Sequence, residues 1–235
     1  MDRATKPYAL GALMSYSNAQ LPRTHDLLEI DPNKFTCCHA SPPEWAVEEL
    51  QRTPFVVVRR GPASEEMIPV GVRGVQRNQR WAAMCSLKLV KNILVPPQLL
   101  RRSVPKSRED AIPAFHVLRI MKEQWRDLDH SWGPGGSTGF ELAAGGNVAK
   151  PESDLDIVIY VVGRITRDMS KFLHAQTLNL PAAVDVRVET PLCGFSLEEF
   201  AWRSPGEILL RTPRGIALGT DPWSDELTEK SVKVR

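Results

Sequence analysis

A run of β-branched residues that begins with two aspartates is the feature that most constrains how this chain can fold. Residues 154–162 read DLDIVIYVV, a length and composition that predict a buried strand. Side chains two apart on a strand point to the same face, so Asp154 and Asp156 should stand side by side, about 6–7 Å apart. Two like charges at that separation repel by about 2–3 kcal/mol at an effective dielectric of about 20. A fold tolerates such a pair if it is solvent-exposed, shares a proton or faces a cation.

A basic, proline-rich segment divides the chain into two units. Residues 95–110 read VPPQLLRRSVPKSRED, which is typical of a linker. The 235 residues are enough for one large or two modest domains. We expect an N-terminal extension at 1–21, a β-rich domain at 22–95, a linker at 96–109, a second domain at 110–223 and a charged tail at 224–235.

Apolar periodicity predicts strands in the first unit and a mixture of helices and strands in the second. Short strands are expected within 54–60 and 67–74, and helices within 111–129 and 166–178, the latter capped by Thr166. Residues 131–145, SWGPGGSTGFELAAG, read as a loop that leads into the acidic strand. Residues 182–190 alternate as a half-buried strand, 196–199 form a capping box that opens a short helix, and 208–218 predict a strand pair.

The composition excludes several classes of protein. With 42% hydrophobic and 25% charged residues the chain resembles an ordinary globular protein, and its apolar runs are too short to cross a membrane. A net charge of +2 gives no argument for nucleic acid. None of the cysteines, Cys37, Cys38, Cys85 and Cys193, lies in a CxxC pair. Cys37, Cys38 and His39 lack a second ligand cluster for a soft metal, so we expect reduced thiols and a cytoplasmic location.

Small residues and three carboxylates in the second unit form a candidate active site. Gly136 and Ser137 lie in a turn before the acidic strand, and Asp185 lies on a later strand. Carboxylate oxygens together with substrate phosphates are the ligands that Mg²⁺ prefers. Asp154, Asp156 and Asp185 are therefore predicted to hold a metal ion, with Asp185 also assisting deprotonation of an attacking hydroxyl. Glu189, on the same face as Asp185, competes for the third position.

These motifs resemble known proteins at two levels. GS followed by SDLDIVIY resembles the signature of the nucleotidyltransferase (DNA polymerase β-like) superfamily. More specifically, segments in both units resemble the phosphoribosyl-dephospho-CoA transferase family of the malonate decarboxylase system, also called malonate decarboxylase holo-acyl-carrier-protein synthase. The segments are HDLLEI (25–30), PFVVVRR (54–60), IPVGVRGVQRNQRWA (68–82), GSTGFELAAG (136–145), SDLDIVI (153–159), VDVRVET (184–190), LLRTPRG (209–215) and DPW (221–223).

The resemblance implies a fold, a reaction and partners. The fold would be α+β, a β-rich N-terminal domain followed by a nucleotidyltransferase-like α/β domain with a mixed sheet. The donor would be 2′-(5″-triphosphoribosyl)-3′-dephospho-CoA, and the acceptor a serine of the apo acyl-carrier subunit of malonate decarboxylase. Attack at the α-phosphate would release pyrophosphate. Asp154 and Asp156 carry over as metal ligands, with Asp185 as the third carboxylate, and Gly136 and Ser137 as contacts of the triphosphate. The metal would be Mg²⁺, with Mn²⁺ as an alternative.

Arginines of the first unit gather in two short segments. Guanidinium groups match phosphate oxygens in pairs, so Arg60, Arg73 and Arg80 are candidate contacts of the donor. The same side chains could instead attract an acidic carrier protein or form a solvated basic face. His25, just before an apolar run, is expected to cap or pack and not to catalyse.

Two other functions compete with this interpretation. The scaffold could serve another Mg²⁺-dependent nucleotidyltransferase that acts on a small molecule, a protein or RNA. The chain could also be a non-catalytic module that binds anions or a carrier protein through its arginines. Only the three carboxylates argue against the binding module, because a pure anion binder would not place them beside its ligand.

Overall fold

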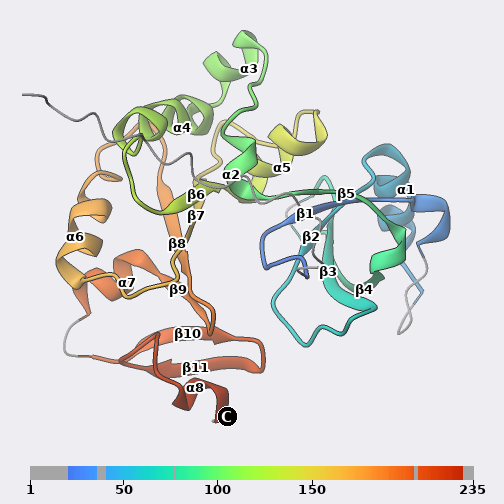
Figure 1. The fold of residues 1–235 in the computed structure, drawn as a ribbon. Coiled ribbons are helices and arrows are strands. Elements are labelled where there is room, and N and C mark those ends of the chain that lie inside the picture. Colours follow the sequence, from blue (N-terminus) through green and yellow to red (C-terminus); the bar gives the residue numbers. More distant parts are fainter. Residues whose placement is uncertain (1–20, 36–40, 77, 204–205, 230–235) are drawn as a thin grey trace, which may run out of the picture.

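The computed structural model describes residues 21–35, 41–76, 78–203 and 206–229. Most of the expected N-terminal extension, the end of the expected tail, and the Cys37, Cys38 and His39 cluster lie outside these ranges. Figure 1 shows two lobes, each built around one sheet and joined by the segment that carries α2 (Pro96–Leu99).

The N-terminal lobe is a five-stranded antiparallel sheet in the order β4-β3-β2-β1-β5 (Figure 1). Its strands are β1 (Leu27–Ile30), β2 (Phe55–Val58), β3 (Met67–Arg73), β4 (Arg80–Ser86) and β5 (Val90–Leu94). Helix α1 (Glu44–Arg52) and the 3₁₀ turns η1 (Pro32–Lys34) and η2 (Leu87–Leu89) complete it. One face of this sheet, with Leu28, Val56 and Val70, packs into a core of its own that includes Leu50 of α1. The strands expected within 54–60 and 67–74 are confirmed.

The second lobe is a six-stranded mixed sheet in the order β11-β10-β9-β8-β7-β6. Its strands are β6 (Ser131–Pro134), β7 (Leu155–Tyr160), β8 (Val184–Glu189), β9 (Gly194–Ser196), β10 (Ile208–Thr212) and β11 (Gly215–Gly219). Its helices are α3 (Lys106–Ala111), α4 (Pro113–Gln124), α5 (Gly136–Ala144), α6 (Arg167–Ala175), α7 (Leu197–Trp202) and α8 (Glu226–Glu229). Only β7 and β8 run parallel, because α6 returns the chain between them. The expected α+β class with a mixed second sheet is confirmed.

Local capping signals fix several helix boundaries as expected. The Thr166 side chain accepts a hydrogen bond from the Met169 backbone N–H at 3.0 Å and starts α6. The Ser196 side chain accepts one from the Glu199 N–H at 3.4 Å and starts α7. Each bond satisfies a donor that the first helical turn leaves without a partner.

The loop expected at 131–145 is wrong, since these residues form β6 and α5. The prediction failed because α5 has no polar face that the sequence could reveal. Residues 137–143 are all buried, Ser137, Thr138 and Glu141 among them. Glu141 can be buried because Arg108 donates two hydrogen bonds to its carboxylate, both at 2.9 Å.

The two lobes share part of a core. Leu27 of β1 and Leu94 of β5 join the apolar cluster of the second lobe, and the Phe55 ring meets the Phe140 ring edge-on at 6.5 Å. The side chain of Arg102 donates to the backbone carbonyls of Leu142 and Ala143, which ties the inter-lobe segment to α5. The segment expected as a linker therefore packs against the second lobe.

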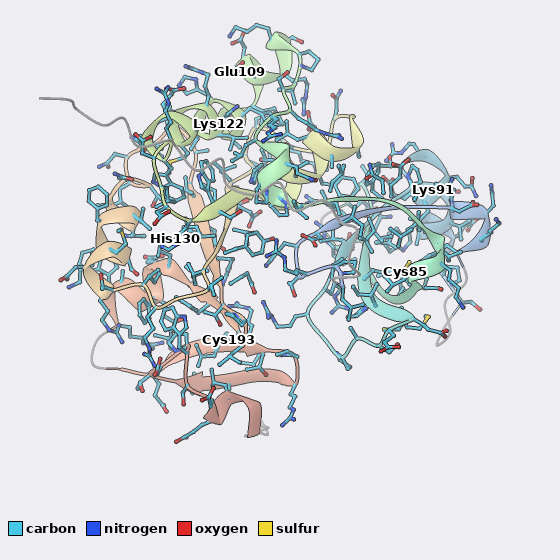
Figure 2. The ribbon with its side chains drawn as sticks, in the orientation of Figure 1. Cys85, Lys91, Glu109, Lys122, His130 and Cys193 are labelled. Atoms are coloured by element: carbon cyan, nitrogen blue, oxygen red, sulfur yellow. The ribbon has the colours of Figure 1, made fainter. Side chains whose placement is uncertain are left out.

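None of the described helices is long and apolar enough to cross a bilayer. Figure 2 labels Cys85 in the N-terminal sheet and Cys193 in the second lobe. Both thiols are buried and unbridged, and burial raises the pKa of each to about 11. They are inert apolar packing groups in this structure.

Candidate active site

Three aspartates meet where the parallel strands β7 and β8 begin. In the register of this pair Asp156 lies directly opposite Asp185, so both side chains project from the same face of the sheet. Asp154 lies just before β7, exposed to solvent. The parallel pairing thus joins residues that are far apart in sequence into one carboxylate cluster, which we define as Asp154, Asp156 and Asp185.

The neighbouring carboxylates affect the pKa of Asp156. Burial raises its pKa to about 6, and the charges of Asp154 and Asp185 act in the same direction. Arg73 and Arg187 oppose the shift without cancelling it. A carboxyl group that is already destabilised as an anion gains from any further cation placed beside it.

Asp185 has a cation of its own. The Arg187 guanidinium donates to the Asp185 carboxylate at 2.8 Å from the same face of β8. Arg187 also lines a cavity beside the cluster, and the sequence prediction gave it no role. The signal was present in VDVRV, where residues 185 and 187 alternate outward with the apolar valines.

The N-terminus of α5 lies against the cluster. The Gly135 N–H donates to the Asp156 carbonyl at 2.8 Å. Gly136 has a φ of +52°, and a Cβ built on it would lie 1.7 Å from Asp156 Oδ2. Only glycine fits this position, because any side chain would both strain the backbone and displace the carboxylate. Ser137, the next residue, is buried in the first turn of α5.

The carboxylate cluster opens into two cavities that share one wall. The first, the sheet crevice, has a volume of about 490 Å³ and lies between the N-terminal sheet and the face of β7 and β8. The second, the helix pocket, has a volume of about 440 Å³ and includes Ser137, Asn147, Lys150, Ser153 and Asp154 in its wall. Arg73, Arg80, Phe140 and Asp156 line both. The cluster therefore lies at the boundary between two compartments.

Arg73 and Arg80 reach this boundary from the N-terminal lobe. Burial and the charge of Arg80 lower the pKa of Arg73, while Asp156 and Asp154 raise it. The Arg80 side chain donates a hydrogen bond to the Gln79 carbonyl at 2.9 Å, and it lines both cavities. Both arginines predicted from the sequence lie beside the predicted carboxylates.

Arg60, the third predicted phosphate contact, lies elsewhere. Its guanidinium donates to Glu189 Oε2, and Glu189 Oε1 also hydrogen-bonds His25 Nε2 at 3.0 Å. We call Arg60, His25 and Glu189 the inter-lobe cluster. Burial alone would raise the pKa of Glu189, but the hydrogen bond with His25 and the charge of Arg60 lower it overall. Arg60 is not among the residues that line either cavity, so the structure does not bring it to the carboxylates.

Two further basic residues also line the cavities. Arg59 lies in the sheet crevice and Lys150 in the helix pocket. Neither side chain makes an ion pair or a hydrogen bond with another described residue. An unpaired cation in a concave wall is available to a ligand anion. No local pattern marks Lys150, since it lies in an irregular segment between α5 and β7.

Comparison with known proteins gives consistent matches over nearly the whole described chain. Residues 23–96 match the family profile described as phosphoribosyl-dephospho-CoA transferase MdcG N-terminal domain, and residues 100–222 match the C-terminal domain of the same family. A phosphoribosyl-dephospho-CoA transferase of Pseudomonas fluorescens is 33% identical over 206 residues, which cover 87% of this chain and 96% of the relative. A transferase of the same description from Klebsiella pneumoniae is 32% identical over 209 residues, which cover 87% and 98%. One from Pseudomonas aeruginosa is 34% identical over 181 residues, which cover 77% and 85%. No solved structure matches.

Proposed function

This chain belongs to the phosphoribosyl-dephospho-CoA transferase family, and we propose that its carboxylate cluster directs the transfer that attaches the malonate decarboxylase prosthetic group. The donor would be 2′-(5″-triphosphoribosyl)-3′-dephospho-CoA. The acceptor would be a serine hydroxyl on the apo acyl-carrier subunit. The same reaction on another donor or acceptor would leave the site argument unchanged, so donor and acceptor are what the experiment must test.

The observation that carries the proposal is the position of Asp156. It lies opposite Asp185 on the neighbouring strand, against the Gly136 backbone, and in the wall of both cavities. A group at this boundary can contact an α-phosphate whose two substituents occupy different compartments. Its pKa, raised to about 6 mainly by burial, is that of a carboxylate with too few cations around it.

The donor set fits a magnesium ion that is held jointly with the substrate. Among the described residues no group of three or more His, Cys, Asp and Glu side chains is placed to hold a metal ion by itself. Magnesium does not need one, because it commonly takes one or two carboxylates and completes its shell with phosphate oxygens and water. Asp154 and Asp156 would hold it, with Asp185 completing the set. When bound, the ion would neutralise the charge that develops on the reacting phosphate oxygens.

Asp185 and not Glu189 is the third carboxylate in this proposal. Asp185 is level with Asp156, whereas Glu189 lies four residues further along β8, about 13 Å away at the rise of a strand. Glu189 is also already satisfied by His25 and Arg60. An anion with two cationic or donor partners has little to offer a metal ion.

The chain's residues then divide the chemistry between them. The serine oxygen forms a bond with the α-phosphorus while the bond from the α-phosphorus to the α–β bridging oxygen breaks, and pyrophosphate leaves. Asp185 accepts the serine proton, with Arg187 holding its carboxylate in place. Ser137 and the first backbone N–H groups of α5 bind the outer phosphates, and Gly136 lets the Asp156 carboxylate lie against the start of this helix. Arg73 and Arg80 stabilise the negative charge of the donor from the opposite lobe.

The acyl-carrier subunit and a cytoplasmic location belong to the same proposal. The phosphoribosyl-dephospho-CoA part of the donor follows from the family, and the carrier protein is the acceptor that the malonate decarboxylase reaction requires. The free, buried thiols of Cys85 and Cys193 support a reducing compartment.

Intact-mass spectrometry of the apo acyl-carrier subunit tests the function. The protein is incubated with carrier, donor and Mg²⁺, and we expect the carrier mass to rise by one phosphoribosyl-dephospho-CoA unit while pyrophosphate accumulates. A Ser→Ala carrier variant is the acceptor control. An unmodified carrier, combined with turnover of ATP on an RNA or a small molecule, would replace this assignment with another nucleotidyltransferase. No pyrophosphate with any acceptor would favour a non-catalytic anion-binding module.

A further inference from the structure

One wall of the sheet crevice is a row of apolar residues on the N-terminal sheet. In the register of the N-terminal sheet, Leu27 pairs with Val57, Val57 with Gly71, and Gly71 with Ala82. Paired residues of antiparallel strands share a face, so these four form one row that faces the crevice, and all four line it. The two smallest members, Gly71 on β3 and Ala82 on the edge strand β4, leave a shallow apolar floor at one end of the row.

The opposite wall belongs to the second lobe. Phe140 of α5 and Val158 of β7 face the crevice together with Asp156. The two walls therefore bound a slot with apolar surface from both lobes, which is also lined by Asp156 and by the arginines Arg59, Arg73, Arg80 and Arg187. Such a slot suits a flat, weakly polar group attached to an anion.

Arg59 is a cation of the slot that has no carboxylate partner among the described residues. The Arg59 side chain lies across Gly71, where a Cβ would meet Arg59 Cδ at 3.1 Å. Its guanidinium makes no ion pair or hydrogen bond with the described residues. Arg187, by comparison, is engaged by Asp185. Arg59 is therefore available to pair with a phosphate bound beside the apolar row, in addition to Arg73 at the carboxylate cluster.

The helix pocket has the opposite character. Its wall carries the Ser137 and Ser153 hydroxyls, the Asn147 amide and the uncommitted Lys150 ammonium group. These are donors for phosphate oxygens and offer little surface for stacking a base. Both compartments meet at Asp156.

We infer that the sheet crevice binds the adenosine diphosphate end of the dephospho-CoA moiety, with its base against the apolar row and the Arg59 stem that lies across Gly71, and with its diphosphate paired with the Arg59 guanidinium, while the helix pocket takes the leaving phosphates. This inference rests on the proposed function, because it places the two parts of that donor, which join at the reacting α-phosphate, in different cavities. It gives the N-terminal lobe a role, which is to select a CoA-derived donor over a simple nucleoside triphosphate.

A crossed binding experiment on the full chain tests the division without using the carrier protein or the transfer reaction. Isothermal titration calorimetry measures the Kd of dephospho-CoA and, separately, of inorganic tripolyphosphate with Mg²⁺. Ala82→Leu fills the floor of the crevice at an exposed strand position, and Arg59→Ala removes its cation. Lys150→Ala removes the cation of the helix pocket. Lys122→Ala, on exposed α4 (Figure 2), is the matched control.

We expect Ala82→Leu and Arg59→Ala each to weaken dephospho-CoA binding by about tenfold and tripolyphosphate binding by less than about twofold. Lys150→Ala should do the reverse, Arg59→Lys should recover part of the lost affinity, and Lys122→Ala should change neither. Equal losses for both ligands, a crossed pattern of the opposite sense, or no dephospho-CoA binding by the unaltered protein would overturn the inference. Because transfer to the carrier is assayed separately, this failure would leave the proposed function standing, and failure of transfer would leave the binding pattern measurable.

Discussion

Asp185 and Glu189 lie on the same strand, β8, and on the same face of it, but their surroundings differ. Glu189, in the inter-lobe cluster, contacts Arg60 and His25, and its pKa lies below the usual range although it is buried. Asp185, in the carboxylate cluster, shares its end of the strand with Asp156 and Asp154, and the pKa of Asp156 lies above the usual range. The protein thus neutralises the charge of Glu189 with its own side chains, whereas Asp156 has too few cations around it to offset burial and the neighbouring acids.

This difference indicates different roles: the inter-lobe cluster stabilises the contact between the lobes, and the carboxylate cluster is the reactive site. A buried carboxylate that is paired with cationic side chains stabilises the contact between the lobes, because removing one member of the pair would leave the other as an unpaired buried charge. A carboxylate crowded by other acids costs stability in the free protein and is retained where a cation arrives with the substrate. The following substitutions test whether the two clusters differ in this way.

Asp156→Asn should give the largest effect. We expect transfer to the carrier to fall by about 10³-fold, because the ion that stabilises the phosphate charge loses a ligand. The midpoint of thermal unfolding at neutral pH should stay the same or rise, since a repelled charge disappears. Asp168→Asn, at an exposed position of α6, is the matched control and should keep full transfer. Near-normal transfer by Asp156→Asn at saturating Mg²⁺ would remove Asp156 from the metal site.

Gly136→Ala should come next, with transfer reduced by about 10²-fold because the new Cβ displaces the Asp156 carboxylate. Gly145→Ala is a close control, since Gly145 also has a positive φ, +67°, but has nothing within 4 Å of its built Cβ. Both variants should lose about 1 kcal/mol of stability from backbone strain, and only the first should lose transfer. If the two variants lose transfer equally, the contact with Asp156 has no catalytic importance.

Glu189→Gln probes the inter-lobe cluster. We expect the free energy of unfolding in urea to fall by about 3 kcal/mol, because Arg60 keeps its charge without an anionic partner. Glu66→Gln is the control, since its pair with Lys88 is exposed and should contribute less than about 1 kcal/mol. A Glu189→Gln protein as stable as the Glu66→Gln protein would show that this cluster does not hold the lobes together.

The pH dependence of stability gives the smallest effect. The pKa of Asp156 is about 6 in the folded protein against 3.8 for the free side chain, so the folded state holds its proton more tightly. Its contribution to stability is complete below pH 4 and is lost as the pH rises through 6. In metal-free protein, Asp156→Asn should therefore be more stable than wild type by about 1–2 kcal/mol at pH 7.5, and the difference should vanish near pH 4. Asp26, with a pKa also raised to about 6, is present in both proteins and cancels. A difference that does not change with pH would contradict the shifted titration.

Local signals in the sequence predicted the elements that carry the carboxylates. The β-branched run of β7, the alternation of β8 and the Thr166 cap of α6 each depend on neighbouring residues only, so they could be recognised without the fold. The sequence grouped Asp185 with Asp154 and Asp156 from their order on two strands, but the position of Asp185 opposite Asp156 depends on the parallel register, which only the fold shows.

Contacts between the lobes could not be predicted in the same way. His25 and Glu189 are separated by 164 positions, and nothing near either residue indicates the other. For the same reason Arg60 was expected at the donor phosphates. Helix α5 was missed because burial on every side removes the amphipathic pattern by which helices are recognised.

The most direct measurement of the central claim is the anomalous diffraction of Mn²⁺ in a crystal of this protein grown with the donor and without carrier. The account predicts a peak about 2.0–2.2 Å from carboxylate oxygens of Asp154 and Asp156 and from a donor phosphate oxygen, and none at Glu189. A peak bound only to donor phosphates, or one at Glu189 with the Asp156 carboxylate turned away, would contradict it.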